Sequence, residues 1–142
     1  MSITTLVTFV EVFSVDINNN KSTKHRLQNA KREPSEDSNS ANNTILFNGQ
    51  NYHYLPFIYQ GTTINRSGDN IESNLIMGNH PLSMSKAQEA VINRYFVEVN
   101  VCVVSNDNID NVTNILTTDT WLAASLSYDP EVVEVLLSSA ID

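Results

Sequence analysis

The sequence predicts a mainly β domain, either a small antiparallel β-barrel or a β-sandwich, with one short flanking helix. Several short segments alternate apolar and polar residues with a period of two, which is typical of strands. Only one segment, around residues 83–95, has apolar residues at helical spacing. The chain has 142 residues, 41% of them hydrophobic, which is enough for one core. We therefore expect a single domain over residues 1–142.

The first strand is predicted over residues 6–15, where β-branched and aromatic residues alternate around Glu11. The next segment, residues 18–43, consists of Asn, Ser, Lys, Glu and Asp with few apolar side chains. Such a segment cannot bury enough area to offset about 1–2 kcal/mol of backbone entropy per residue. We expect a polar, mobile insert here that becomes ordered only against a neighbouring subunit.

A hairpin is predicted over residues 45–59, because Asn48-Gly49 suits the two central positions of a type I′ turn. A turn over residues 65–70 follows, and alternation then predicts a strand over residues 71–77.

The helix is predicted to follow His80-Pro81, where proline ends the preceding strand. Ser83 and Ser85 are both possible N-caps, and Ser85 with Gln88 matches a capping box. The helix would have about three turns and would lay an alanine-rich face on the sheet.

Residues 97–104 alternate most regularly and predict a central strand. Residues 105–114 are rich in Asn and Asp, which indicates a turn region. Residues 119–128 and 133–137 flank Asp129-Pro130 and predict a second hairpin.

Composition limits the classes of function. The chain carries 16 acidic and 8 basic residues, a net charge of −8, which disfavours tight binding to nucleic acid phosphates. The only cysteine, Cys102, excludes an internal disulfide and fits a reducing compartment. No stretch resembles a signal peptide or reaches the roughly 18 apolar residues of a membrane span, so we expect synthesis in the cytoplasm and no membrane insertion.

The sequence predicts no catalytic, cofactor-binding or metal-binding residues. The histidines, His25, His53 and His80, lack the spacing that brings metal ligands together. No phosphate-binding loop, nucleophile elbow or zincin helix occurs. Cys102 lies among valines, where a thiol behaves as a small apolar group. We do not expect an enzyme.

Four aromatic residues of the first predicted hairpin are candidate interface residues: Tyr52, Tyr54, Phe57 and Tyr59. Aromatic side chains on a sheet can stack on nucleotides or sugars, but few basic residues accompany these four. The favoured interpretation is packing in the core or against another subunit, where tyrosine combines apolar area with a polar group.

The order of several motifs resembles a family of tailed-phage tail-tip or baseplate proteins, and in particular the amino-terminal part of lambda-type minor tail protein L. The resemblance rests on residues 46–61 (LFNGQNYHYLPFIYQG), Ser67-Gly68-Asp69, the valine-rich residues 97–104 and residues 125–130 (SLSYDP). It covers about two-thirds of the chain. Longer members continue into an iron–sulfur domain, but this chain has a single cysteine, so no cluster and no other cofactor is expected.

This resemblance implies a virion structural protein at the lower end of a phage tail, with the β-barrel type of fold that tail tubes use. The partners would be the distal tail protein, the central hub and neighbouring copies, in a homotrimer or, alternatively, a hexamer around the DNA channel. DNA would meet it only in passage, and acidic groups facing the channel would repel that DNA. The protein would be assembled in the host cytoplasm and reside in the virion tail. The alternatives are a free-standing module that binds a glycan or peptide, and a tail-assembly chaperone.

Overall fold

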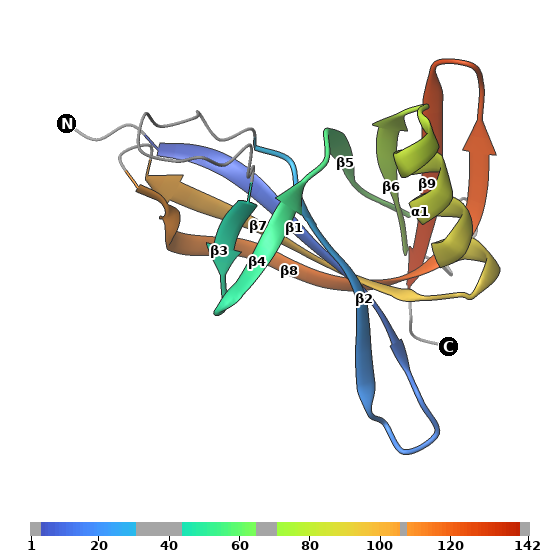
Figure 1. Cartoon of the computed structure of the whole chain (residues 1–142), viewed down its shortest axis with the longest axis horizontal. Coiled ribbons are helices and arrows are strands. Elements are labelled where there is room, and N and C mark those ends of the chain that lie inside the picture. Colours follow the sequence, from blue (N-terminus) through green and yellow to red (C-terminus); the bar gives the residue numbers. More distant parts are fainter. Residues whose placement is uncertain (1–3, 31–43, 65–70, 106–107, 140–142) are drawn as a thin grey trace.

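The computed structural model describes residues 4–30, 44–64, 71–105 and 108–139, which form nine strands and one helix. The elements are β1 (Thr4–Val15), β2 (Lys21–Gln28), β3 (Thr44–Phe47), β4 (Gln50–Tyr54), β5 (Phe57–Ile64), β6 (Ile71–Gly78), α1 (Pro81–Ile92), β7 (Phe96–Ser105), β8 (Asn108–Tyr128) and β9 (Val132–Ser139). The strands form one sheet in the order β3-β4-β2-β1-β7-β8-β9-β6-β5 (Figure 1). Within the described residues, no helix has the length and apolarity needed to cross a membrane.

The prediction of a mainly β chain with one short helix is confirmed. The sheet begins at β3 and ends at β5, so it is open. This agrees with the sandwich alternative and not with a closed barrel. All neighbouring strands pair antiparallel except β2 and β4, which pair in parallel through the two register positions Leu27↔His53 and Gln28↔Tyr54.

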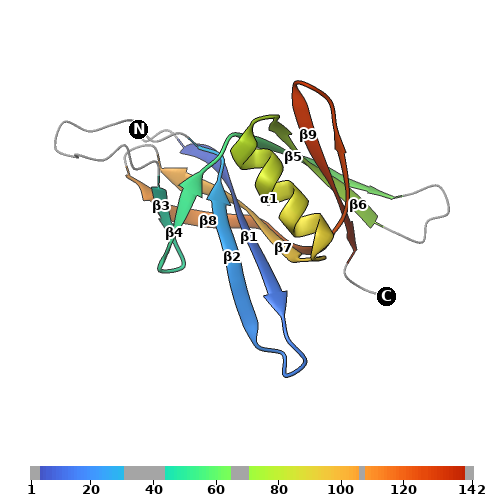
Figure 2. The ribbon, with the colours of Figure 1, turned by 45° about the vertical axis from the view of Figure 1, so that its right-hand side comes forward.

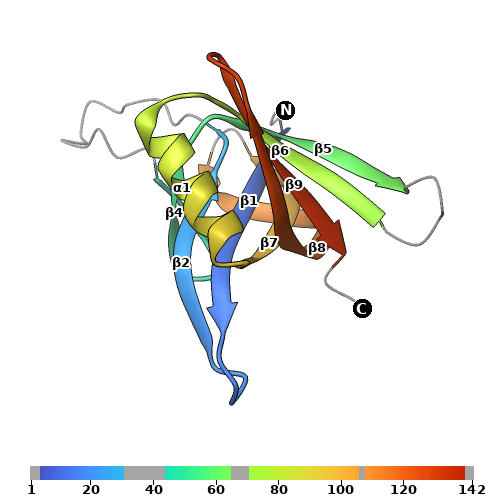
Figure 3. The same cartoon turned by 90° about the vertical axis from the view of Figure 1, so that its right-hand side faces the viewer.

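The larger core lies between α1 and one face of the sheet. Figures 2 and 3 show α1 lying along this face, with β2 and β4 on one side of it and β9 on the other. Three small residues of the helix, Ser83, Ala87 and Ala90, are buried, so its backbone lies close to the strands. The predicted alanine-rich contact face is therefore present.

A smaller core lies beneath the β3–β4 hairpin. Phe9 stacks on Phe47 with ring centroids 4.4 Å apart, and Tyr52 meets Phe9 edge-on. Cys102 is fully buried in the same cluster, as its valine-rich surroundings predict. The first strand contributes to both cores: Val10 packs in the larger one and Phe9 in the smaller one. This is the alternation by which successive side chains point to opposite faces.

The predicted hairpins and central strand are confirmed. Asn48 and Gly49 both have positive φ, 53° and 75°, as a type I′ turn requires. The valine-rich strand is β7, which lies between β1 and β8. The second hairpin is formed by β8 and β9, which pair through the register Tyr128↔Val133 next to the turn.

The prediction of a mobile insert over residues 18–43 is wrong for residues 21–28, which form β2. This strand pairs with β1 over the register from Phe9↔Gln28 to Val15↔Lys21. Composition suggested disorder because β2 has one large apolar side chain, Leu27, but backbone pairing and charged contacts hold the strand in place. Residues 31–43 and the predicted turn at 65–70 lie outside the described residues.

Two boundaries also differ from the prediction. The turn expected at 105–114 is shorter, because β8 already begins at Asn108 and pairs with β7 through several register shifts. The helix begins at Pro81, ahead of both predicted caps, with His80 as its N-cap. Ser83 serves as the third helical residue in a capping box with His80. Proline is favoured at the first helical position because it has no N–H to leave unpaired.

Candidate functional site: a basic groove between β2 and α1

The four aromatic residues predicted as an interface do not form one surface. Tyr52 is 4% exposed in the smaller core, and Phe57 is 7% exposed in the larger one. Tyr59 is half-buried, and its hydroxyl accepts a hydrogen bond of 3.0 Å from Trp121 Nε1. Tyr54 is also half-buried. Tyr52 and Phe57 therefore pack within the chain.

Burial also affects the ionisation of the tyrosines and of the cysteine. Desolvation raises the pKa of Tyr52 to about 12 and that of the Cys102 thiol to about 11. The pKa of Tyr59 is raised as well, again mainly by burial. None of the three groups therefore loses its proton readily near neutral pH. The cysteine lacks the thiolate character that a nucleophile needs.

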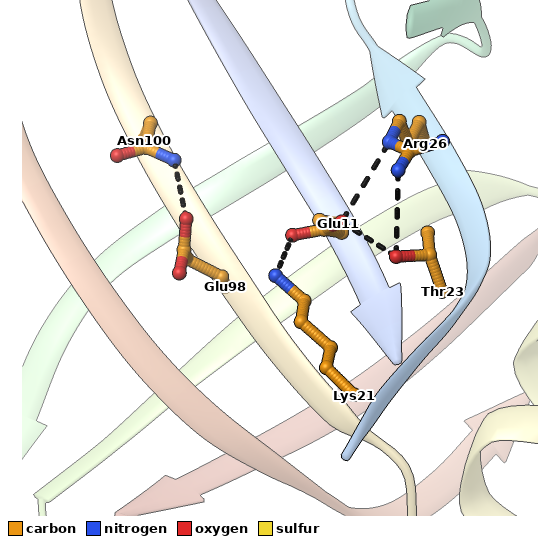
Figure 4. Close-up of polar contacts among 6 residues, drawn as sticks. All are labelled: Glu11, Lys21, Thr23, Arg26, Glu98 and Asn100. Atoms are coloured by element: carbon orange, nitrogen blue, oxygen red, sulfur yellow. Dashed lines mark hydrogen bonds and ion pairs between the residues drawn. The ribbon is translucent and has the colours of Figure 1, made fainter. Parts of the chain in front are cut away.

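A charged cluster on one face of β1 and β2 explains how β2 is held. Glu11 is buried on β1 and accepts a hydrogen bond from Lys21 Nζ and another, of 2.8 Å, from Thr23 Oγ1 (Figure 4). Arg26 Nε lies 3.6 Å from Glu11 Oε2. Because all three partners belong to β2, one carboxylate fastens this strand to β1.

The polar contacts continue onto β7 and β8. Asn100 donates a hydrogen bond of 3.1 Å to Glu98 Oε1, and it accepts one of 2.6 Å from Thr118 Oγ1. Glu98 lies opposite Glu11 in the β1–β7 register. This face of the sheet therefore carries a polar band beside the smaller apolar core.

Residues of β2, α1 and β4 line a groove, which we call the basic groove. Its volume is about 430 Å³. It is lined by Thr23, Lys24, His25, Arg26, Leu27, Asn51, His53, Leu82 and Lys86. None of these described lining residues is acidic, although acidic residues outnumber basic ones two to one in the chain. The groove is therefore a local concentration of positive charge on a negatively charged protein.

His25 links the wall of the groove to the helix. Lys86 Nζ lies 3.1 Å from His25 Nδ1, and Glu89 Oε2 lies 3.3 Å from His25 Nε2 without being aligned for a hydrogen bond. An ammonium group can only donate, so Nδ1 is the acceptor and the imidazole is neutral with its proton on Nε2. Lys86 uses one of its three N–H donors in this contact.

The electrostatics agree with a neutral imidazole. Burial lowers the pKa of His25 below its ordinary value of 6.5, and Lys86 lowers it further, while Glu89 acts in the opposite direction. Lys24 also lies nearby, with its Nζ 5.6 Å from the ring centroid of Tyr95 beyond the end of the helix. The groove thus holds two lysines whose charges are not neutralised by a lining carboxylate.

The chemistry of the basic groove suits an anionic ligand. Lysine ammonium groups and an asparagine amide can donate to carboxylate or phosphate oxygens, and Leu82 adds an exposed apolar wall. In the described part of the chain, no group of three or more His, Cys, Asp or Glu side chains could hold a metal ion. The groove is therefore a candidate site for binding an anion.

Sequence reasoning missed this groove because it treated residues 18–43 as a loop. One signal was present: five of the eight basic residues lie between positions 21 and 32. No sequence pattern indicates that His25 contacts Lys86 and Glu89, because these contacts join residues about sixty positions apart.

Comparison with known proteins finds no family model, no curated protein and no solved structure that matches this chain. The site is therefore interpreted from its own geometry.

Proposed function

We propose that this chain is a structural subunit of a phage tail tip or baseplate, which works by binding neighbouring copies and other tail proteins around the DNA channel. The motif order described above motivates the proposal. The resemblance implies a β-barrel domain. The chain shares only the mainly β class with one helix, because its sheet is open.

The observation that carries the proposal is apolar surface displayed on projecting or edge elements. The β1–β2 hairpin extends away from the rest of the sheet (Figure 1), and Ile17 in its turn is 97% exposed. An isoleucine exposed at the end of a projecting hairpin gains stability only when another molecule covers it.

The β5 edge of the sheet offers a second contact surface. This strand has eight residues and a single neighbour, β6, in the sheet of the described residues. Ile58 on it is 62% exposed. Sheet edges are where another chain can add a strand, and a structural protein can use this property in assembly.

The glycan- or peptide-binding alternative has less support. Binding on a stacked aromatic face would need Tyr52 and Phe57 at the surface, and both are buried. The assembly-chaperone alternative would use the same exposed surfaces, but the protein would be absent from the finished particle.

Mass spectrometry of purified virions tests the proposal. We expect the chain in particles from producing cells, at a fixed ratio to other tail proteins that corresponds to a trimer or a hexamer. Recovery of the chain only from assembly intermediates would instead identify a chaperone. Absence from both would refute a role in the tail.

A further inference from the structure

We propose that the basic groove binds the turn between β8 and β9 of a second copy of this chain. The inference rests on the proposed function, because it names the contact by which neighbouring copies of a tail subunit would hold one another. The proposed partner is an acidic, preformed turn, and the groove provides lysine ammonium groups and an apolar wall.

The groove has donors left for a ligand. Lys86 Nζ contacts His25 Nδ1 at 3.1 Å, and an ammonium group has three N–H donors. Lys24 and Asn51 also line the groove and can donate to an anion. A carboxylate placed here would meet positive charge from both β2 and α1.

The β8–β9 turn has the complementary charge. Of the acidic residues whose side chains the structure describes, Asp16, Asp129 and Glu131 are exposed, and two of these three belong to this turn. Asp16 and Asp129 already accept hydrogen bonds from backbone N–H groups of their own turns. The Glu131 carboxylate makes no hydrogen bond or ion pair with the described residues, so it is available to a partner.

The turn is also rigid and accessible. Asp129 Oδ1 accepts 2.8 Å hydrogen bonds from the backbone N–H groups of Glu131 and Val132. Asn79 ties the turn to the body, since its side chain donates to Asp129 O at 2.6 Å and its backbone to Glu131 O at 2.9 Å. Figure 1 shows the turn at the end of a projecting hairpin. A preformed turn loses little conformational freedom on binding.

Apolar groups accompany the charges on both sides. Tyr128 is 66% exposed at the turn, and Leu82 is 54% exposed on the wall of the groove. Contact between them would bury apolar area beside the ion pair, and an aromatic anchor is typical of the centre of an interface.

A second copy is the partner that these charges favour. The chain carries −8 overall, and none of the described residues lining the groove is acidic, so another copy is repelled except where its acidic turn meets the groove. Groove and turn are different surfaces, so the contact is heterologous and each copy can bind two neighbours, as a ring requires. A turn in a groove buries less than the ~1,200 Å² of a stable interface, so each contact should be weak and sensitive to salt.

A charge exchange on the purified full chain tests the inference. Sedimentation velocity at low and high salt should show reversible self-association that salt weakens. Lys86→Glu and Glu131→Lys should each weaken it by about tenfold or more. The double variant should regain association, because the exchanged charges attract again. Arg94→Glu, which changes the net charge as Lys86→Glu does but lies outside the groove, should associate like the wild type.

Three results would overturn the inference: a wild type that stays monomeric, single variants that associate like the wild type, or a double variant as weak as the single ones. Circular dichroism of each variant shows that it is folded. These results would not refute the proposed function, since a chain found in virions could bind its neighbours through another surface. Conversely, restored association in a chain absent from virions would refute only the tail assignment.

Discussion

At the scale of single residues, Glu11 shows how a charged side chain can be useful inside a sheet. Its carboxylate is buried on β1, and it contacts Lys21, Thr23 and Arg26, all on β2. A carboxylate removed from water is tolerated only when partners replace its hydration. Here the partners also decide where β2 lies, and β2 forms one wall of the basic groove.

We therefore expect Glu11→Gln to lower the free energy of unfolding by about 2 kcal/mol, because the amide keeps the shape but leaves two cations without their counter-charge. Urea unfolding measures the change. Glu131→Gln is the matched control, since its side chain is exposed, and it should change stability by less than about 0.5 kcal/mol. Equal effects of the two substitutions would show that Glu11 does not hold β2.

His25 predicts a dependence of stability on pH. Its pKa is lowered in the folded chain, first by burial and then by Lys86, so the unfolded chain takes up a proton at a higher pH than the folded chain does. The contribution of His25 to stability is complete above its unfolded pKa of 6.5 and declines as the pH falls through the folded value. Stability should therefore fall as the pH drops below about 6.5.

The variant His25→Gln should show a smaller decline in the urea midpoint over the same range, because it carries no proton to exchange. His53→Gln removes an exposed imidazole from the same groove and is the control for loss of a histidine. An unchanged decline in His25→Gln, or an equal reduction in both variants, would contradict the assignment to His25.

At the scale of elements, the sequence predicts those that depend on alternation or on a specific turn. The alternating valines, Val97 and Val99 among them, predict the central strand. The structure buries both of these side chains in the larger core. Asn48-Gly49 identifies the hairpin because few residue pairs adopt two positive φ angles. These are local signals, and the structure agrees with them.

Elements held by distant charges are not predictable in this way. Only Leu27 on β2 is a large apolar residue, and the strand is held by Glu11, which is ten to fifteen positions earlier in the chain. The helix start was misplaced for a different reason. His80 acts as the N-cap through its side chain, whereas Ser83 and Ser85 are the more usual residue types for that position.

The β3–β4 hairpin covers the smaller core and predicts a measurable opening. Cys102 lies fully buried beneath it, in contact with the cluster that contains Phe47. Phe47→Ala should cost about 3 kcal/mol and should raise the rate at which an alkylating reagent labels Cys102, because the hairpin opens more often. Labelling is followed by mass spectrometry under native conditions.

Leu46→Ala is the control for this experiment, since Leu46 is adjacent but 45% exposed. It should leave the labelling rate close to that of the wild type. If Phe47→Ala lowered global stability without changing the labelling rate, the hairpin would not be the cover that protects Cys102.

At the scale of the whole molecule, the distribution of charge is uneven. Of the described basic residues, Lys21, Lys24 and Arg26 lie on β2 and Lys86 faces that strand from α1. Net charge is visible in the sequence, but this segregation depends on packing β2 against α1. The candidate site therefore required the structure, whereas the fold class did not.

The proposed function makes a prediction about the projecting β1–β2 hairpin. Ile17 is 97% exposed, so Ile17→Asp removes no contact within the chain and should change the free energy of unfolding by less than about 0.5 kcal/mol. If a neighbouring tail protein covers this residue, the charge would be buried without a partner, and incorporation into virions should drop severalfold. Quantitative mass spectrometry of particles from complemented cells measures this incorporation.

Ile92→Asp is the control, because it places the same charge at a helix residue that is 77% exposed. Equal incorporation of Ile17→Asp and wild type would show that the hairpin stays in solvent.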